Sequence, residues 1–254
     1  MTSWEGPGGS VRASDGAGYA AGMTAATPSH DVSTTGSVNA GDDVTVLGLV
    51  AALELATFER LAADAAVAPT LQDKVQLAQA SAAAIARHGR LVARLAVLGA
   101  DPLVAMEPFA HVLDDFDART PPSTWWERLL KAVVGYGVAD DFCRHLAGGL
   151  DEQTRTVVLS VLDDVAYADV AASELLAAGS ADDVLVSRLA LWGRRLVGEA
   201  LGVVQTVLAA HPELLRLATV DLAGAAGDRD HSPKLFGQLT AEHTRRMARL
   251  GLTA

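Results

Sequence analysis

The sequence of 254 residues contains a single cysteine, Cys143, and few aromatic residues. One cysteine excludes an internal disulfide and a zinc site built from cysteines, and it fits a reducing compartment. We expect Cys143 to be a small core residue. Aromatic residues make up 5% of the chain, whereas hydrophobic residues make up 50% and are mostly Ala, Leu and Val. This composition favours closely packed helices over a β-sandwich, so we expect an all-α protein.

Positive charge and long apolar runs are also scarce. The formal net charge of -11 argues against a general binder of nucleic acids or anionic membranes, whose affinity comes from Lys and Arg that neutralise phosphates. No apolar run approaches the roughly 20 residues that span a bilayer, and the N-terminus lacks a basic segment followed by an apolar stretch. We therefore expect a cytoplasmic protein with no membrane partner.

The motifs of several large enzyme classes are missing as well. The chain has no GxGxxG, P-loop, GxSxG or HExxH pattern, which removes most nucleotide-binding and hydrolase functions. Residues 1–43 are rich in Gly, Ser, Thr and Ala and have no periodic apolar face, so we predict a disordered tail there. Residues 44–254 are predicted to form one helical domain.

Capping residues divide this domain into long helices. The expected helix starts are Asp43 or Thr45, Thr70 with Asp73, Thr124 with Glu127, Asp151, Asp182 and Ser232. The expected ends lie before Pro69, at Gly99, and near Gly148, Gly179 and Ala210. Between Gly99 and Thr124, Asp101 and Pro102 start a short helical segment, and Pro121 and Pro122 close a long connection.

The second helix contains the stretch KVQLAQASAAAIARHGRLVARLAVL, from Lys74 to Leu98. Its larger apolar residues recur at the helical period and predict a largely buried helix: Leu77, Ile85, Val92 and Leu95. His88 falls within this stripe. A buried imidazole needs a partner, so His88 is either a core histidine with a hydrogen bond or a metal ligand.

Three other helices also carry a ligand-type side chain near mid-length on the expected buried stripe. The four residues are Glu54, His88, Asp141 and Asp164. Carboxylates are rarely buried unless they are paired or bind a metal. A ferritin-like di-iron bundle needs such residues, because two of its helices each supply a carboxylate and the other two each supply Glu-x-x-His. Residues i and i+3 share a helix face, so both side chains of that motif can reach the metals.

Several segments resemble the actinobacterial ferritin-like proteins grouped with MiaE, the tRNA hydroxylase that acts on 2-methylthio-isopentenyl-adenosine. The segments are LELATFERLAADAAVAP, AAAIARHGRL, PSTWWERLLKAVVG, ADDF, RLALWGRRLVGEALGVVQ and EHTRRMARLGL. The resemblance covers nearly everything after residue 43. It implies a ferritin-like four-helix bundle with additional C-terminal helices, a non-haem di-iron site and oxygen-dependent hydroxylation.

Within this resemblance, Glu54 matches the first-helix carboxylate, His88 the first histidine, Asp141 the third-helix carboxylate and Asp164 the acid of the second Glu-x-x-His motif. Two positions depart from the pattern. Ile85 stands where the first motif has its bridging Glu, and Tyr167 stands where the second has its His. Ile cannot bind a metal and neutral Tyr is a poor Fe(II) ligand, so the di-iron ligand set is incomplete.

Two functions follow from these residues. In the first, Glu54, His88 and Asp164 hold one iron or manganese ion, Asp141 assists, and the partners are molecular oxygen and an electron donor. A second iron and tRNA enter only through the resemblance, and the net charge disfavours tRNA. In the second, the same groups form a metal-free core of an interaction or structural module. The sequence identifies no catalytic residue and no substrate, and it leaves assembly into a homo-oligomer open.

Overall fold

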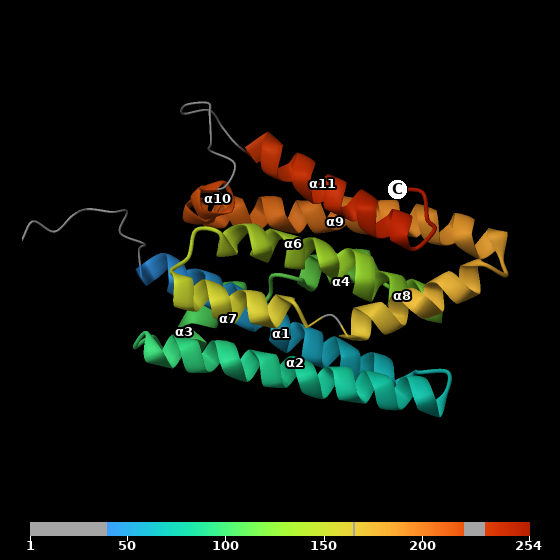
Figure 1. Ribbon diagram of the computed structural model, residues 1–254, viewed down its shortest axis with the longest axis horizontal. Coiled ribbons are helices and arrows are strands. Elements are labelled where there is room, and N and C mark those ends of the chain that lie inside the picture. Colours follow the sequence, from blue (N-terminus) through green and yellow to red (C-terminus); the bar gives the residue numbers. More distant parts are fainter. Residues whose placement is uncertain (1–39, 165, 221–231) are drawn as a thin grey trace, which may run out of the picture. The chain divides into compact units, whose positions relative to one another are not determined.

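The computed structural model describes residues 40–164, 166–220 and 232–254, in which every regular element is a helix (Figure 1). This confirms the predicted all-α fold. Residues 1–39 of the predicted tail lie outside the described residues. Asp43 and Thr45, which were expected to cap the first helix, lie inside it. Cys143 is fully buried, as expected.

The described residues form the following elements in chain order. They are α1 (Ala40–Ala66), α2 (Leu71–Val97), α3 (Pro102–Met106), a 3-10 turn (Glu107–Phe109), α4 (Asp114–Arg119), α5 (Trp125–Leu130), a π turn (Lys131–Gly135), α6 (Tyr136–Ala147), α7 (Glu152–Leu162), α8 (Ala166–Gly179), α9 (Asp183–Ala210), α10 (Pro212–Ala218) and α11 (Ser232–Arg249). The predicted long connection after Gly99 is therefore largely helical.

Helices α1 and α2 form an antiparallel hairpin. Thr70 caps α2 as predicted, since its hydroxyl oxygen accepts a hydrogen bond from the Asp73 backbone N–H at 3.1 Å. Gly99 follows the helix with φ of 73°, a conformation that glycine adopts without strain. The expected burial of α2 is partly wrong, because the helix packs mainly on α1 and Ile85 is 39% exposed.

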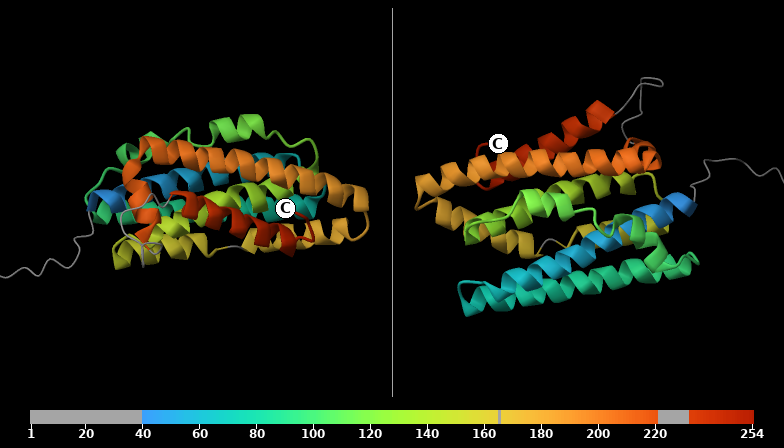
Figure 2. Two further views of the ribbon diagram at one scale, coloured as in Figure 1. Left: turned by 90° about the horizontal axis from the view of Figure 1, so that it is seen from above. Right: turned by 180° about the vertical axis from the view of Figure 1, so that it is seen from behind.

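Helix α6 lies at the centre of the fold. Figures 1 and 2 show the α1–α2 hairpin on one side of it and α9 with α11 on the other. Thr124 caps α5 as predicted, by accepting from the Glu127 N–H at 3.2 Å. The π turn then continues α5 into α6 without a break in the chain direction. Because α6 is packed on opposite sides, it has two interior faces instead of the single one that its sequence predicted.

The predicted helix from Asp151 to Gly179 is divided into α7 and α8. Asp151 caps α7 as expected, with its side chain accepting from the N–H groups of Gln153 and Thr154. The helix stops at Leu162, and Asp164 follows it outside any helix. The expected one-turn relation between Asp164 and Tyr167 within a continuous helix is therefore wrong.

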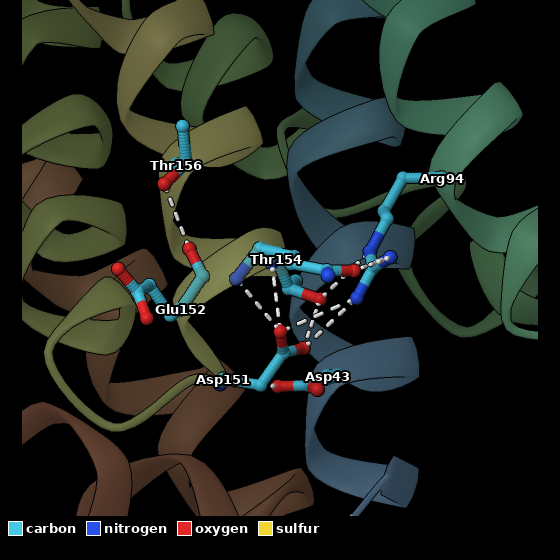
Figure 3. A network of polar contacts seen from close by, with 7 residues as sticks. Asp43, Arg94, Asp151, Glu152, Thr154 and Thr156 are labelled. Atoms are coloured by element: carbon cyan, nitrogen blue, oxygen red, sulfur yellow. Dashed lines mark hydrogen bonds and ion pairs between the residues drawn. The ribbon is translucent and has the colours of Figure 1, made fainter.

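A polar network joins the first turn of α1 to α2 and α7 (Figure 3). The Arg94 guanidinium donates to both carboxylate oxygens of Asp151 at 3.3 and 3.2 Å, and its Nε donates to the Thr154 hydroxyl at 3.0 Å. Asp43 is buried beside this network and accepts from the Asp151 N–H. Burial and the neighbouring Asp151 carboxylate raise the pKa of Asp43 to about 7. The network fixes one end of the α1–α2 hairpin against α7.

No single helix among the described residues has the length and apolarity needed to cross a bilayer. Leu71–Val97 and Pro102–Arg119 together reach the required length and apolarity, but this pair is bent by 115°.

Candidate functional site

A cavity of about 330 Å³ lies between α1, α2, α6 and the break between α7 and α8. It lies within the size range of small-molecule sites. Its charged and aromatic lining residues are Glu54, Arg60, Arg87, Tyr136, Asp140, Asp164 and Tyr167. Apolar residues such as Leu61, Val161 and Leu162 complete the wall. We call this space the central cavity.

An arginine joins two carboxylates in this cavity. Nε of Arg87 on α2 donates to Oε2 of Glu54 on α1 at 3.0 Å, and its Nη1 donates to Oδ2 of Asp164 at 3.2 Å. The Arg87 and Glu54 side chains are 12% and 11% exposed, whereas Asp164 is 40% exposed. The planar guanidinium has several donors in fixed directions, so one side chain can serve both acids.

Glu54 is the most enclosed of the three carboxylates, with 9% of its surface exposed. Burial disfavours its charged form and raises its pKa to about 7, and the negative charges of Asp140 and Asp164 act in the same direction. Arg87 opposes this shift by its positive charge and its hydrogen bond. Glu54 therefore exchanges its proton near neutral pH.

Asp140 is the third carboxylate of the cavity. Its side chain is accessible to solvent, yet its position at the centre of the molecule desolvates the charge and raises its pKa to about 6. The positive charges of Arg246, Arg144 and Arg87 oppose this shift. Within the described part of the chain, no hydrogen bond or ion pair joins Asp140 to another residue.

Arg60 and Tyr136 form another part of the wall. The Arg60 guanidinium carbon lies 4.2 Å from the centre of the Tyr136 ring, and Nη1 of Arg60 is 3.6 Å from Asp64. Buried Nε and Nη1 of Arg60 have no hydrogen-bond partner in the described structure. Tyr136 donates its hydroxyl to Asp117 at 2.7 Å, and its pKa is raised by burial, so it stays protonated.

The structure does not bring the four predicted metal ligands to one point. Glu54 and Asp164 share the central cavity through Arg87. His88 instead donates from Nδ1 to the Ala51 carbonyl at 3.0 Å, which is the hydrogen-bonded alternative considered from the sequence. Asp141 turns towards α11, where Nη2 of Arg246 donates to both of its oxygens at 2.8 and 2.7 Å. Neither His88 nor Asp141 lines the cavity.

The two departures from the di-iron pattern have different surroundings. Ile85 lies on the exposed face of α2 and does not line the cavity, so a carboxylate at that position would start on the wrong side of the helix. Tyr167 on α8 does line the cavity, and burial raises the pKa of its hydroxyl. Tyr167 is thus a neutral member of the wall.

The side chains that line the cavity do not fit a di-iron centre. Among the described residues, no group of three or more His, Cys, Asp and Glu side chains has the arrangement of a metal site. The place between Glu54 and Asp164 is taken by the Arg87 guanidinium, which is itself a cation. No histidine among the lining residues supplies the nitrogen ligand that the Glu-x-x-His pattern requires.

Sequence reasoning missed Arg87 and Asp140, each of which adjoins a predicted ligand. A signal for Arg87 was present, because Gln76, Ala80, Ala83 and Arg87 recur every three or four residues and define one face of α2. Asp140 had no such signal, since the choice between it and Asp141 depends on the neighbours on both sides of α6.

Comparison with known proteins bears on the fold. A family model described as "Ferritin-like domain, actinomycetes" matches residues 40–220. The match covers α1 to α10 and every residue that lines the central cavity. A search of curated proteins found no match.

Proposed function

Because the chain belongs to the family of ferritin-like domains from actinomycetes, we propose that it is a metal-free member, in which Arg87 supplies the cation between Glu54 and Asp164. The protein acts as a helical binding module and not as an oxygen-activating enzyme. The observation that carries this proposal is the double contact of the Arg87 guanidinium, at 3.0 Å to Glu54 and 3.2 Å to Asp164.

The electrostatic reason is the cost of isolated buried charge. Two carboxylates that face each other inside a protein repel, and each needs a cation or a proton. In a metal protein the ion meets this need, whereas here the guanidinium of Arg87 does so with directed hydrogen bonds. A metal ion at the same place would have to displace Arg87 and leave its charge without a partner in a partly buried position.

A single-metal hydroxylase of the MiaE type is the second candidate. The observation in its favour is that Glu54, Asp140 and Asp164 line one cavity. Such an enzyme would need iron, molecular oxygen, an electron donor and, if the resemblance extends to the substrate, tRNA. Since the lining residues do not fit the di-iron pattern, we derive no reaction step through a metal.

Metal content and the Arg87→Ala variant distinguish the two candidates. Purified natural protein should contain no stoichiometric iron, manganese or zinc by elemental analysis. Its melting temperature should not rise when Fe(II) or Mn(II) is added, because a ligand stabilises a protein only when it binds the folded state. Arg87→Ala should destabilise the protein by on the order of 2 kcal/mol, below the value for a fully buried pair, because Asp164 is partly exposed.

Arg90→Ala is the matched control. Arg90 lies one turn further along α2 and is exposed, and its only hydrogen bond within the described residues is a long one of 3.5 Å to Ser160. Its removal should leave the melting temperature nearly unchanged. Stoichiometric iron in the natural protein, or a rise in its melting temperature with Fe(II), would favour the hydroxylase and overturn the metal-free proposal.

A further inference from the structure

We propose that the central cavity binds a small organic amine in its protonated form, with Asp140 as the counter-ion. The inference deepens the proposed function and rests on it, since a cavity without a metal leaves Asp140 available to a ligand. It names the chemical class of that ligand: one ammonium group on a compact apolar body.

The first argument is the pairing of the three carboxylates. Glu54 and Asp164 both accept from Arg87. Asp140 lines the same cavity and makes no hydrogen bond or ion pair with another described residue, while the more distant charges of Arg246, Arg144 and Arg87 only lower its pKa. An ammonium group beside Asp140 would supply both a positive charge and N–H donors, which makes a charge-assisted hydrogen bond. Asp140 is therefore the place where a ligand gains most from binding.

The second argument is the charge of the wall. Three carboxylates and two guanidinium groups line the cavity, and one of the two guanidiniums, that of Arg60, is also paired with Asp64 outside it. With all groups ionised, the lining residues themselves carry one net negative charge, although Arg246 and Arg144 act on Asp140 from outside the lining. A ligand with a single positive charge balances this charge, whereas an anionic ligand would add to the repulsion.

The third argument separates an amine from a metal ion. A metal ion needs several ligand atoms at short distances, and the described residues offer no such group. An ammonium group needs only one close carboxylate, while its organic body can use apolar contacts. The wall supplies these contacts through Leu61, Ala83, Val161, Leu162 and Val170. The volume of about 330 Å³ fits a molecule with a small ring or short chain.

Calorimetric titration with 2-phenylethylamine at pH 8 tests the inference, with 2-phenylethanol as the neutral probe of similar shape. At this pH both Asp140 and Glu54 are largely ionised. We expect one saturable site for the amine and at least tenfold weaker binding of the alcohol. Asp140→Asn should weaken amine binding at least tenfold, as expected for loss of a charge-assisted hydrogen bond. Asp169→Asn is the matched control, because Asp169 is exposed on α8 and does not line the cavity; it should change the affinity less than twofold.

Thermal melting of each variant checks that it is folded. If Asp140→Asn does not fold, Ala83→Phe replaces it, since a larger side chain at Ala83 fills the cavity and should abolish amine binding. The inference is overturned if the amine does not bind, if the alcohol binds equally well, or if neither variant weakens binding. Iron analysis of the same preparation keeps the two proposals apart. Iron-free protein that ignores the amine contradicts only the inference, whereas iron-loaded protein contradicts the proposed function.

Discussion

Glu54 should make the protein less stable as the pH rises through neutrality. Its pKa is about 7 in the folded protein and 4.5 in an ordinary solvated glutamate. Between these values the folded protein keeps a proton that the unfolded chain has lost. The contribution of Glu54 to stability is therefore complete below pH 4.5 and is lost as the pH rises through 7.

The size of this effect follows from the same two values. Raising the pKa of a carboxyl from 4.5 to about 7 corresponds to about 3 kcal/mol. Glu54→Gln removes the titration but keeps the shape and an oxygen that can accept from Arg87. The natural protein should therefore lose about 3 kcal/mol more than Glu54→Gln between pH 4.5 and 8. For a chain of this size each kcal/mol moves the melting temperature by roughly 2 to 4 °C.

Urea unfolding at several pH values between 4.5 and 8 measures this difference directly. Other carboxylates titrate in both proteins, so the difference between the two curves isolates Glu54. The reasoning is refuted if the two curves run parallel, or if the natural protein gains stability relative to Glu54→Gln as the pH rises. Either result would mean that Arg87 offsets the whole cost of burying the charge.

Two further substitutions test the packing. Gly48→Ala should destabilise the protein by about 1 to 3 kcal/mol in urea unfolding, because the new methyl carbon would lie 2.1 Å from the backbone oxygen of Ala105. Gly89→Ala should instead stabilise the protein by up to about 1 kcal/mol, because no described atom lies within 4 Å of the new methyl carbon and alanine favours a helix. If both variants change the stability in the same direction, the packing described here is contradicted. Arg246→Ala should cost about 3 to 5 kcal/mol at pH 8, because it leaves the Asp141 carboxylate enclosed and unpaired, and a loss below 1 kcal/mol would show that Asp141 is solvated.

Local signals predicted several helix starts correctly. Capping by Thr70, Thr124 and Asp151 depends on contacts within four residues, which the sequence alone determines. Glu54 was also placed correctly in the interior, since α1 packs with one face towards α2 and α6. The break before α8 was missed because no proline or glycine marks it.

The candidate site depended on contacts between distant segments. Periodicity gives one buried face per helix, but α6 is packed on two sides, so it could not decide between Asp140 and Asp141. In the structure, Arg246 pairs with Asp141, whereas Asp140 lines the cavity. Arg246 lies 105 residues away from Asp141 along the chain, so the pattern of α6 alone could not reveal this pairing. His88 and Arg87 show the same limit, since the sequence does not reveal which of these two adjacent side chains meets Glu54 of α1.

Helix α11 belongs to the core of this protein although it lies beyond the residues that the family model matches. The match ends at residue 220, yet Leu235, Leu239 and Met247 of α11 are fully buried beyond it. A chain cut after residue 220 would keep every residue that defines the family and would lose one wall of its own core. The same cut would release Asp141, the neighbour of Asp140 on α6, from its arginine. Helix α11 thus packs against and supports α6, the helix that carries Asp140.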